Sequence, residues 1–129
     1  MKQQTRFFLV KAKESLADAQ GILGGGITQQ AARCAYMAVF HAAQAYIFEL
    51  TNRVMKTHNG VQTEFFRLVK DQDSTLREAA IYLHQSYNYK ATADYEVGPT
   101  AQISLTQATE AVRQATTVLN VISECLPRD

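Results

Sequence analysis

The sequence predicts an all-α protein, folded as a five-helix antiparallel up-and-down bundle in a single domain over residues 1–129. Apolar residues recur at intervals of three and four along five separate stretches, as they do on the buried face of a helix. No stretch alternates between apolar and polar residues for long enough to predict a strand. The connections between the five stretches are short, which favours antiparallel neighbours.

The first two helices are predicted over residues 3–23 and from residue 28 to residue 50. The run Gly24-Gly25-Gly26 ends the first, because glycine is entropically costly inside a helix and suits a C-terminal stop. Thr28 is the expected N-cap of the second. Since the second helix is the most apolar and its alanines allow close approach, we expect it at the centre. The two apolar stripes are Phe8, Ala12, Leu16, Ala19 and Leu23, and then Ala32, Tyr36, Val39, Phe40, Ala43, Ile47 and Leu50.

Three further helices are predicted from capping boxes, in which a helix-starting Ser, Thr or Asn precedes Glu or Gln by three residues. The boxes are Asn59 with Gln62, Thr75 with Glu78, and Ser104 with Gln107. The polar residues 71–74 separate the third helix from the fourth. Val97-Gly98-Pro99 ends the fourth helix and Pro127 ends the fifth. The stripes are Val61, Phe65, Leu68 and Val69; Leu76, Ala79, Ala80, Leu83 and Tyr87; and Leu105, Ala108, Val112, Ala115, Leu119, Ile122 and Leu126.

Composition is that of a globular domain, with 47% hydrophobic and 19% charged residues. The formal net charge is +1, so contact with nucleic acid has to come from a local basic patch. Cys34 and Cys125 lie in apolar stretches without zinc-ligand spacing, so we expect two buried, reduced cysteines; a disulfide requires that their helices meet. The most apolar segment, residues 36–48, is too short to cross a bilayer, and the first residues contain no signal region. We therefore expect a cytoplasmic protein without a membrane segment.

Residues 52–60 concentrate the residues that can carry chemistry. Arg53 offers a planar fork of donors suited to phosphate, and His58 can exchange protons near neutral pH. His58 also stands beside a helix N-terminus, where free N–H groups favour anions. Together these side chains can hold a phosphodiester and move a proton. A structural interpretation is also open, in which Arg53 only meets the negative end of a helix dipole and His58 only precedes a helix cap.

Three motifs in register resemble one family. Residues 31–43, AARCAYMAVFHAA, resemble the second-helix signature of the HEPN domain family (higher eukaryotes and prokaryotes nucleotide-binding). Residues 56–60, KTHNG, are similar to its K-T-H-x-G turn, so that Arg53 and His58 match its R-x4-H motif. Residues 93–95, Ala-Asp-Tyr, resemble the A-D-Y end of its fourth helix. The resemblance covers nearly the whole chain in order.

The resemblance implies a homodimeric five-helix bundle and, for many members, a metal-independent endoribonuclease that needs no cofactor. It implies Arg53 and His58 as the catalytic pair, facing their copies across the dimer interface. Such enzymes are often toxins paired with a minimal nucleotidyltransferase antitoxin. The residues expected around the pair are Asn52, Lys56 and Asn59 as contacts to RNA or nucleotide, and Arg33, Asp94 and Tyr95 as supporting residues.

The chain departs from the family pattern at three positions. Val54 follows Arg53, where active members often carry Asn, Asp or His, and Asn52 is the polar residue that can substitute for it. Gly60 stands where one toxin subgroup has a tyrosine that its partner modifies, so we expect no nucleotide transfer to this turn. Lys90 stands where related sequences often have Arg four residues before the Asp of A-D-Y; lysine keeps the charge but not the bidentate geometry.

Other polar residues have structural interpretations. We expect His41 to be a packed or interface histidine and His84 to lie on a solvated flank, with no metal-ligand spacing among the histidines. Arg33 and Asp94 either form an ion pair that joins the second helix to the fourth or are unrelated surface charges. The tyrosines of the fourth helix are expected at the rim of the core rather than as stacking platforms for bases; they are Tyr82, Tyr87, Tyr89 and Tyr95.

Three functions follow as hypotheses: a metal-independent endoribonuclease, a module that binds nucleotide or RNA without cleavage, and a structural partner of a nucleotidyltransferase. The sequence supplies no carboxylate cluster for two-metal hydrolysis, since Asp94 and Glu96 on one helix cannot both aim at a phosphate. His58 as base and Arg53 as phosphate clamp are the available chemistry.

Overall fold

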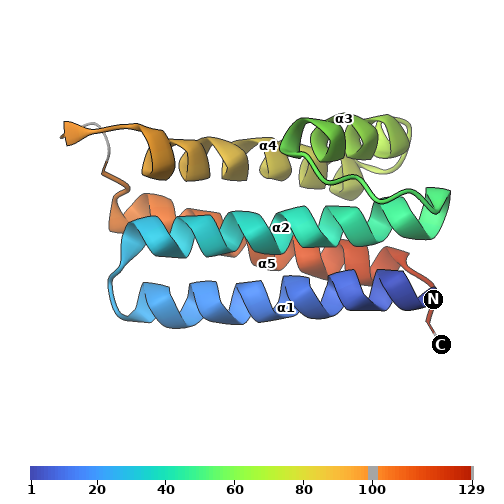
Figure 1. The fold of residues 1–129 in the computed structure, drawn as a ribbon, viewed down its shortest axis with the longest axis horizontal. Helices are drawn as coiled ribbons and strands as arrows, with labels where there is room; N and C mark the ends of the chain where they lie inside the picture. The colour runs from blue at the N-terminus through green and yellow to red at the C-terminus, as the bar shows by residue number, and fades with distance from the viewer. Residues whose placement is uncertain (99–101, 129) are drawn as a thin grey trace.

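The protein is described by a computed structural model that covers residues 1–98 and 102–128, and throughout these ranges the regular structure is helical (Figure 1). The all-α prediction with five helices is confirmed. The helices are α1 (Gln3–Gly24), α2 (Thr28–Thr51), α3 (His58–Val69), α4 (Ser74–Tyr95) and α5 (Leu105–Cys125). None of the helices in the described ranges combines the length and the apolar character that a membrane span needs.

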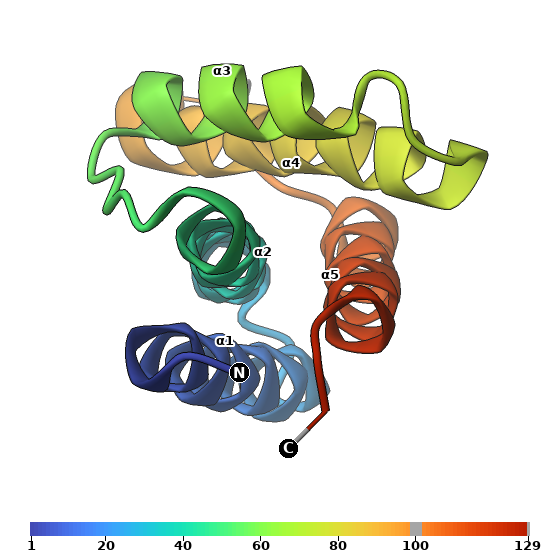
Figure 2. The ribbon, with the colours of Figure 1, turned by 90° about the vertical axis from the view of Figure 1, so that its right-hand side faces the viewer.

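Helix α2 lies at the centre, as predicted, and packs against each of the other four helices. Figure 2 shows α1 on one side of α2 and the layer of α3 and α4 on the other, with α5 beside α2. All seven alanines of α2 are buried, and their small side chains let neighbouring helices approach closely from several directions. The short helix α3 lies outside the four long helices and packs on α2 and α4.

Helix starts differ from three of the sequence predictions. The predicted box of Ser104 with Gln107 is confirmed, with both reciprocal hydrogen bonds present. The N-cap of α4 is Asp73, two residues before the predicted Thr75, because the Asp73 carboxylate accepts the Leu76 N–H and a negative charge is favoured beside the positive end of the helix dipole. At the start of α2, Ile27 occupies the N-cap position without a side-chain hydrogen bond, so Thr28 is not the cap.

The ends of the helices follow the predicted breakers. Helix α1 ends at Gly24, inside the glycine run, and α5 ends two residues before Pro127. Helix α4 ends at Tyr95; Pro99 of the predicted breaker lies outside the described residues. Both cysteines are free, with Cys34 half-buried and Cys125 exposed, so the prediction of two buried cysteines was wrong. Cys125 is the last residue of α5.

Candidate functional site

The loop between α2 and α3 begins with a left-handed turn at Asn52. Its φ is 59°, a conformation that asparagine tolerates better than most residues, and its N–H donates to the Phe48 carbonyl at 2.9 Å to close α2. The Arg53 N–H then donates to Thr51 Oγ1 at 3.1 Å. Asn52 is therefore explained as a helix C-cap, and its exposed side chain does not line the cavity described below.

A buried glutamine of α2 holds the middle of this loop. The Gln44 amide nitrogen donates to the Met55 carbonyl at 2.8 Å, and its Oε1 lies 2.8 Å from Nδ1 of His41. Because an amide oxygen only accepts, this contact assigns the proton to Nδ1 of His41. Burial lowers the pKa of His41, partly offset by that hydrogen bond. The sequence predicts a packed or interface histidine, and His41 is half-buried within the single chain.

Helix α3 is capped by Thr57 rather than by the predicted Asn59. Thr57 Oγ1 accepts the Gly60 N–H at 3.0 Å, which satisfies one of the free donors of the first turn. A Cβ at Gly60 would lie 2.9 Å from Thr57 Oγ1 and 3.3 Å from Cε of Met55. The T-H-x-G part of the motif therefore has a local cause: threonine caps the helix, and glycine leaves room for the cap.

His58 is the first residue of α3, and its imidazole stacks on Tyr87 of α4. The ring centroids are 4.3 Å apart and the planes differ by 15°. The cap at Thr57 fixes the backbone of His58, and the tyrosine ring fixes the orientation of its side chain. His58 is half-buried, so its ring is held without being sealed from solvent.

A cavity of about 230 Å³ lies beside this stacked pair. It is bounded by α2, the start of α3 and the C-terminal half of α4. The cavity is lined by aromatic and apolar side chains, one histidine and two lysines. The lining residues are Tyr36, Met37, Phe40, Lys56, His58, Tyr87 and Lys90. Such a combination suits a ligand that has both a flat apolar part and a negative charge.

Tyr36 is the most buried aromatic residue that lines this cavity. Its side chain is 3% exposed, and its ring meets that of Tyr87 edge-on with centroids 5.6 Å apart. Burial, and then the nearby Tyr87, raise the pKa of its phenol, which stays neutral. Among the described residues the Tyr36 hydroxyl has no hydrogen-bond partner, and a buried hydroxyl without one is costly.

A network of charges joins α2 to the end of α4. Nε of Arg33 lies 2.5 Å from one Asp94 carboxylate oxygen, and Nζ of Lys90 lies 2.7 Å from the other. Burial opposes ionisation of Asp94, but the hydrogen bonds from Lys90 and Arg33 outweigh it and lower its pKa. The Arg33 guanidinium also donates to the Ala93 carbonyl at 2.8 Å. The predicted Arg33–Asp94 ion pair is therefore present, and the same carboxylate holds Lys90 at the cavity.

The predicted site residues divide between this cavity and the surface. His58 and Lys56 line the cavity, while Asn52, Arg53 and Asn59 are exposed and outside its lining. Arg53 instead acts on Glu64 of α3. The pKa of Glu64 is lowered first by the hydrogen bond from Arg67, and then by the positive charges of Arg67 and Arg53.

Tyr95 is 71% exposed and does not line the cavity, but its ring lies 5.5 Å from Nζ of Lys90. The expectation that the tyrosines of α4 lie at the rim of the core describes Tyr82, Tyr87 and Tyr89, which are half-buried, but not Tyr95. His84 is exposed, as predicted.

Sequence reasoning misses most of the cavity wall. It assigns Tyr36 and Phe40 to the core stripe of α2, and it does not single out Met37. It names Tyr87 only as a core or rim residue of the fourth helix, and Lys90 only as a departure from the family pattern. The available signal was spacing: Tyr87 and Lys90 lie three residues apart, on one face of α4. Which residues of α2 face them depends on how the two helices cross.

Comparison with known proteins places the chain in a family. The sequence model of the HEPN domain matches residues 5–125, nearly the whole chain. The chain belongs to the HEPN domain family. Among solved structures, this HEPN domain is similar to the crystal structure of TT1696 from Thermus thermophilus, with a TM-score of 0.76 and 27% sequence identity. The match covers 97% of this chain and 100% of that chain. No curated protein matches the HEPN chain.

Proposed function

We propose that this HEPN domain is a metal-independent endoribonuclease that acts as a homodimer. The observation that carries the proposal is the position of His58. Its ring stacks on Tyr87, the cap at Thr57 fixes its backbone, and it lies beside a cavity with two lysines and an aromatic wall. A phosphodiester at the cavity mouth would lie between Lys56 and Lys90, and an adjoining base would meet the aromatic rings. The part of the chain that the structure describes also brings no three His, Cys, Asp or Glu side chains together as a metal site.

The proposed mechanism uses only groups of the protein and the RNA. His58 takes the proton of the ribose 2′-hydroxyl, whose oxygen attacks the adjacent phosphorus. The Arg53 guanidinium stabilises the phosphorane-like transition state, and the bond from phosphorus to the 5′-oxygen breaks as that oxygen receives a proton. The products are a 2′,3′-cyclic phosphate and a 5′-hydroxyl. Because the nucleophile belongs to the ribose, DNA cannot react.

The dimer supplies the second half of the site. Arg53 is exposed and outside the lining of the cavity that holds His58, so it is accessible to a second copy. We infer that pairing brings Arg53 and His58 of both copies around one phosphate, and that the second His58 protonates the leaving oxygen. A nucleotidyltransferase that binds this turn would block the cleft as an antitoxin. Gly60 offers no hydroxyl there for nucleotide transfer.

Cleavage of RNA by the purified protein tests the proposal. We expect cleavage in EDTA, cyclic phosphate ends, and no cleavage of a 2′-deoxy substrate. His58→Ala should lower the rate by about 10²–10⁴-fold, the usual contribution of positioned acid–base catalysis. The matched control is His84→Ala, which removes an exposed histidine outside this cavity. If RNA binds and no product forms under any of these conditions, the domain is a binding module and the proposed cleavage is wrong.

A further inference from the structure

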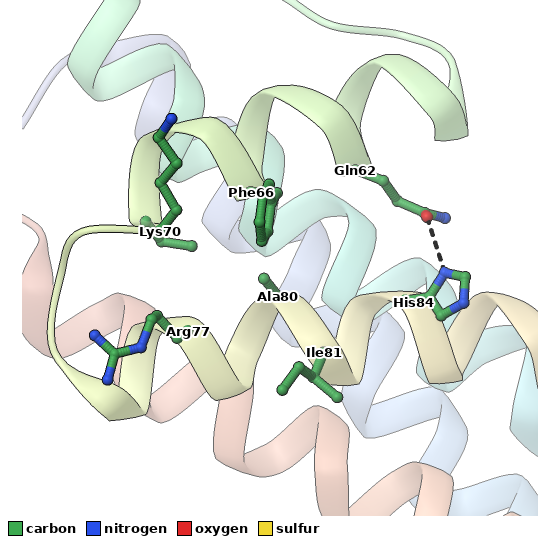
Figure 3. A pocket seen from close by; sticks show the side chains of 8 residues that line it. Gln62, Phe66, Lys70, Arg77, Ala80, Ile81 and His84 are labelled. Atoms are coloured by element: carbon green, nitrogen blue, oxygen red, sulfur yellow. Dashed lines mark hydrogen bonds between the residues drawn. The ribbon is translucent and has the colours of Figure 1, made fainter.

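A second hollow, larger than the one beside His58, lies between α3 and α4. Its volume is about 600 Å³, and it extends along the seam of the two helices on the outer face of the bundle (Figure 3). Its floor and walls are mainly apolar. The lining residues are Gln62, Phe66, Val69, Lys70, Arg77, Ala80, Ile81 and His84.

Two large apolar side chains are left in water at this groove. Phe66 is 59% exposed and Ile81 is 55% exposed, one on each helix. In Figure 3 they lie with Ala80 in the middle of the groove. Apolar side chains that line a hollow, rather than being scattered singly, mark a place where another apolar surface binds.

The two ends of the groove differ in charge. Lys70 on α3 and Arg77 on α4 lie at the end beside the α3–α4 turn, with their charged groups pointing away from each other (Figure 3), and none of the lining residues is acidic. The Arg77 guanidinium also donates to the Gln72 carbonyl, and its charge helps to lower the pKa of Asp73 outside the groove. The positive charge that an anionic group can meet at this end is therefore mainly that of Lys70.

The opposite end is lined by a polar pair, Gln62 and His84. Nδ1 of His84 lies 3.3 Å from Oε1 of Gln62, which accepts, and the Gln62 amide nitrogen is shielded without a partner in the described chain. Gln62 lies one helical turn after His58 on α3, and His84 lies three residues before Tyr87 on α4. The pair therefore stands between the groove and the cavity beside His58.

We propose that the α3–α4 groove binds an amphipathic helix of a partner protein, with its apolar residues against Phe66 and Ile81 and its acidic groups between Lys70 and Arg77. A helix supplies apolar residues at i, i+3 and i+7 along one ridge, and a ridge fills a groove. Its C-terminal end carries partial negative charge, which orients it toward the two cations. The site does not depend on RNA cleavage at His58.

Two other occupants fit the groove less well. A second copy of this chain that docks groove against groove in a two-fold contact would bring no lining carboxylate to meet Lys70 and Arg77. A single strand of RNA carries phosphates at regular intervals and is bound by cations along its path, whereas Lys70 and Arg77 are gathered at one end of a mainly apolar groove.

A labelled helical peptide tests the proposal by fluorescence anisotropy. The probe carries leucines at i, i+3 and i+7 and glutamates elsewhere, and a second probe carries lysines in place of the glutamates. We expect the acidic probe to bind more tightly, and Ile81→Glu or Lys70→Glu to weaken it by about tenfold or more. Val10→Glu is the matched control, since Val10 is 52% exposed on α1 and lies outside the groove.

Each contrary result has a definite meaning. Equal binding of both probes, or unchanged binding to Ile81→Glu, overturns the proposal. Light scattering that shows Ile81→Glu to separate a dimer assigns the groove to an interface between copies and also overturns it. If Lys70→Glu loses affinity for RNA but still binds the peptide, the groove is an RNA-binding site and the proposal is also overturned. Circular dichroism confirms that each variant is folded, which we expect because both positions are exposed.

Discussion

The start of α3 allows a sharp test of why glycine follows the histidine of the motif. Alanine normally stabilises a helix interior by about 0.8–1.0 kcal/mol relative to glycine. At Gly60, however, the new Cβ would lie 2.9 Å from Thr57 Oγ1, closer than real Cβ contacts come, so the capping hydroxyl has to move. Loss of a threonine cap costs about 1 kcal/mol, and displacement of the Met55 methyl at 3.3 Å adds to the cost. We expect Gly60→Ala to gain nothing, or to destabilise the fold by up to about 1 kcal/mol.

The matched control is Gly21→Ala in α1, where a Cβ would meet nothing within 4 Å. There we expect the full gain of about 0.5–1 kcal/mol in the free energy of unfolding. Thr57→Ala removes the hydroxyl and with it the clash. In that background Gly60→Ala should recover the gain in helix propensity, so that the double-mutant cycle shows a coupling of about 1–2 kcal/mol.

Urea titrations of the two single variants, the double variant and the Gly21→Ala control measure all the terms. The reasoning is refuted if Gly60→Ala stabilises the protein as much as Gly21→Ala does, or if its effect is the same with and without Thr57. The same variants report on function, since the cap places the backbone of His58.

Three further predictions follow from the site. Tyr87→Leu keeps an apolar contact but removes the stack, so the proposed RNA cleavage should fall about tenfold or more while the far-UV circular dichroism stays unchanged; full activity would show that His58 needs no platform. Asp94→Asn should flatten the acid limb of the curve of stability against pH. A lowered pKa contributes stability that is complete above the ordinary pKa and is lost as the pH falls through the folded-state pKa. Thermal melts across the acid range measure this, and an unchanged limb contradicts it. Asn52→Val should destabilise the protein by about 1–2 kcal/mol while Asn52→Gly is tolerated, because only the first forces a β-branched residue into a positive φ; equal stabilities by urea titration would contradict a capping role.

The fold could be predicted because its causes are local and repeated. The apolar stripes, the glycine run after α1 and the box at Ser104 each act within a few residues of sequence. Each appears in the structure, except that Leu50 and Leu105, predicted at the ends of two stripes, are exposed. The errors at the starts of α3 and α4 have one cause. Thr57 and Asp73 each stand two residues before the predicted cap, and several residues near each start can accept the same N–H groups. Sequence spacing alone does not decide which of them does.

The site could be predicted only in part, because its walls come from different helices. His58 and Lys56 share one segment, and the motif finds them. Tyr36 and Tyr87 meet only because α4 returns along α2, and their edge-on contact depends on where the two helices cross. The Arg33–Asp94 pair was predicted as one of two alternatives, since an antiparallel return of α4 brings its end near the start of α2. That Lys90 shares the same carboxylate became visible only in the structure.

The backbone of the loop supports the proposal that the cleft is shared between two copies of the chain. Asn52 turns the chain through a left-handed conformation directly after α2, and Gln44 then fixes the loop at Met55 before Thr57 starts α3. Arg53 lies on the first part of this path and His58 at its end, so the two side chains of one motif are separated by two independent anchors. His58 is held against Tyr87, whereas Arg53 is exposed on the loop. We therefore expect the Arg53 of a second copy to complete the proposed cleft. In a variant that prevents pairing, light scattering should show a monomer and the cleavage of RNA should be lost, and cleavage by such a monomer would refute the shared cleft.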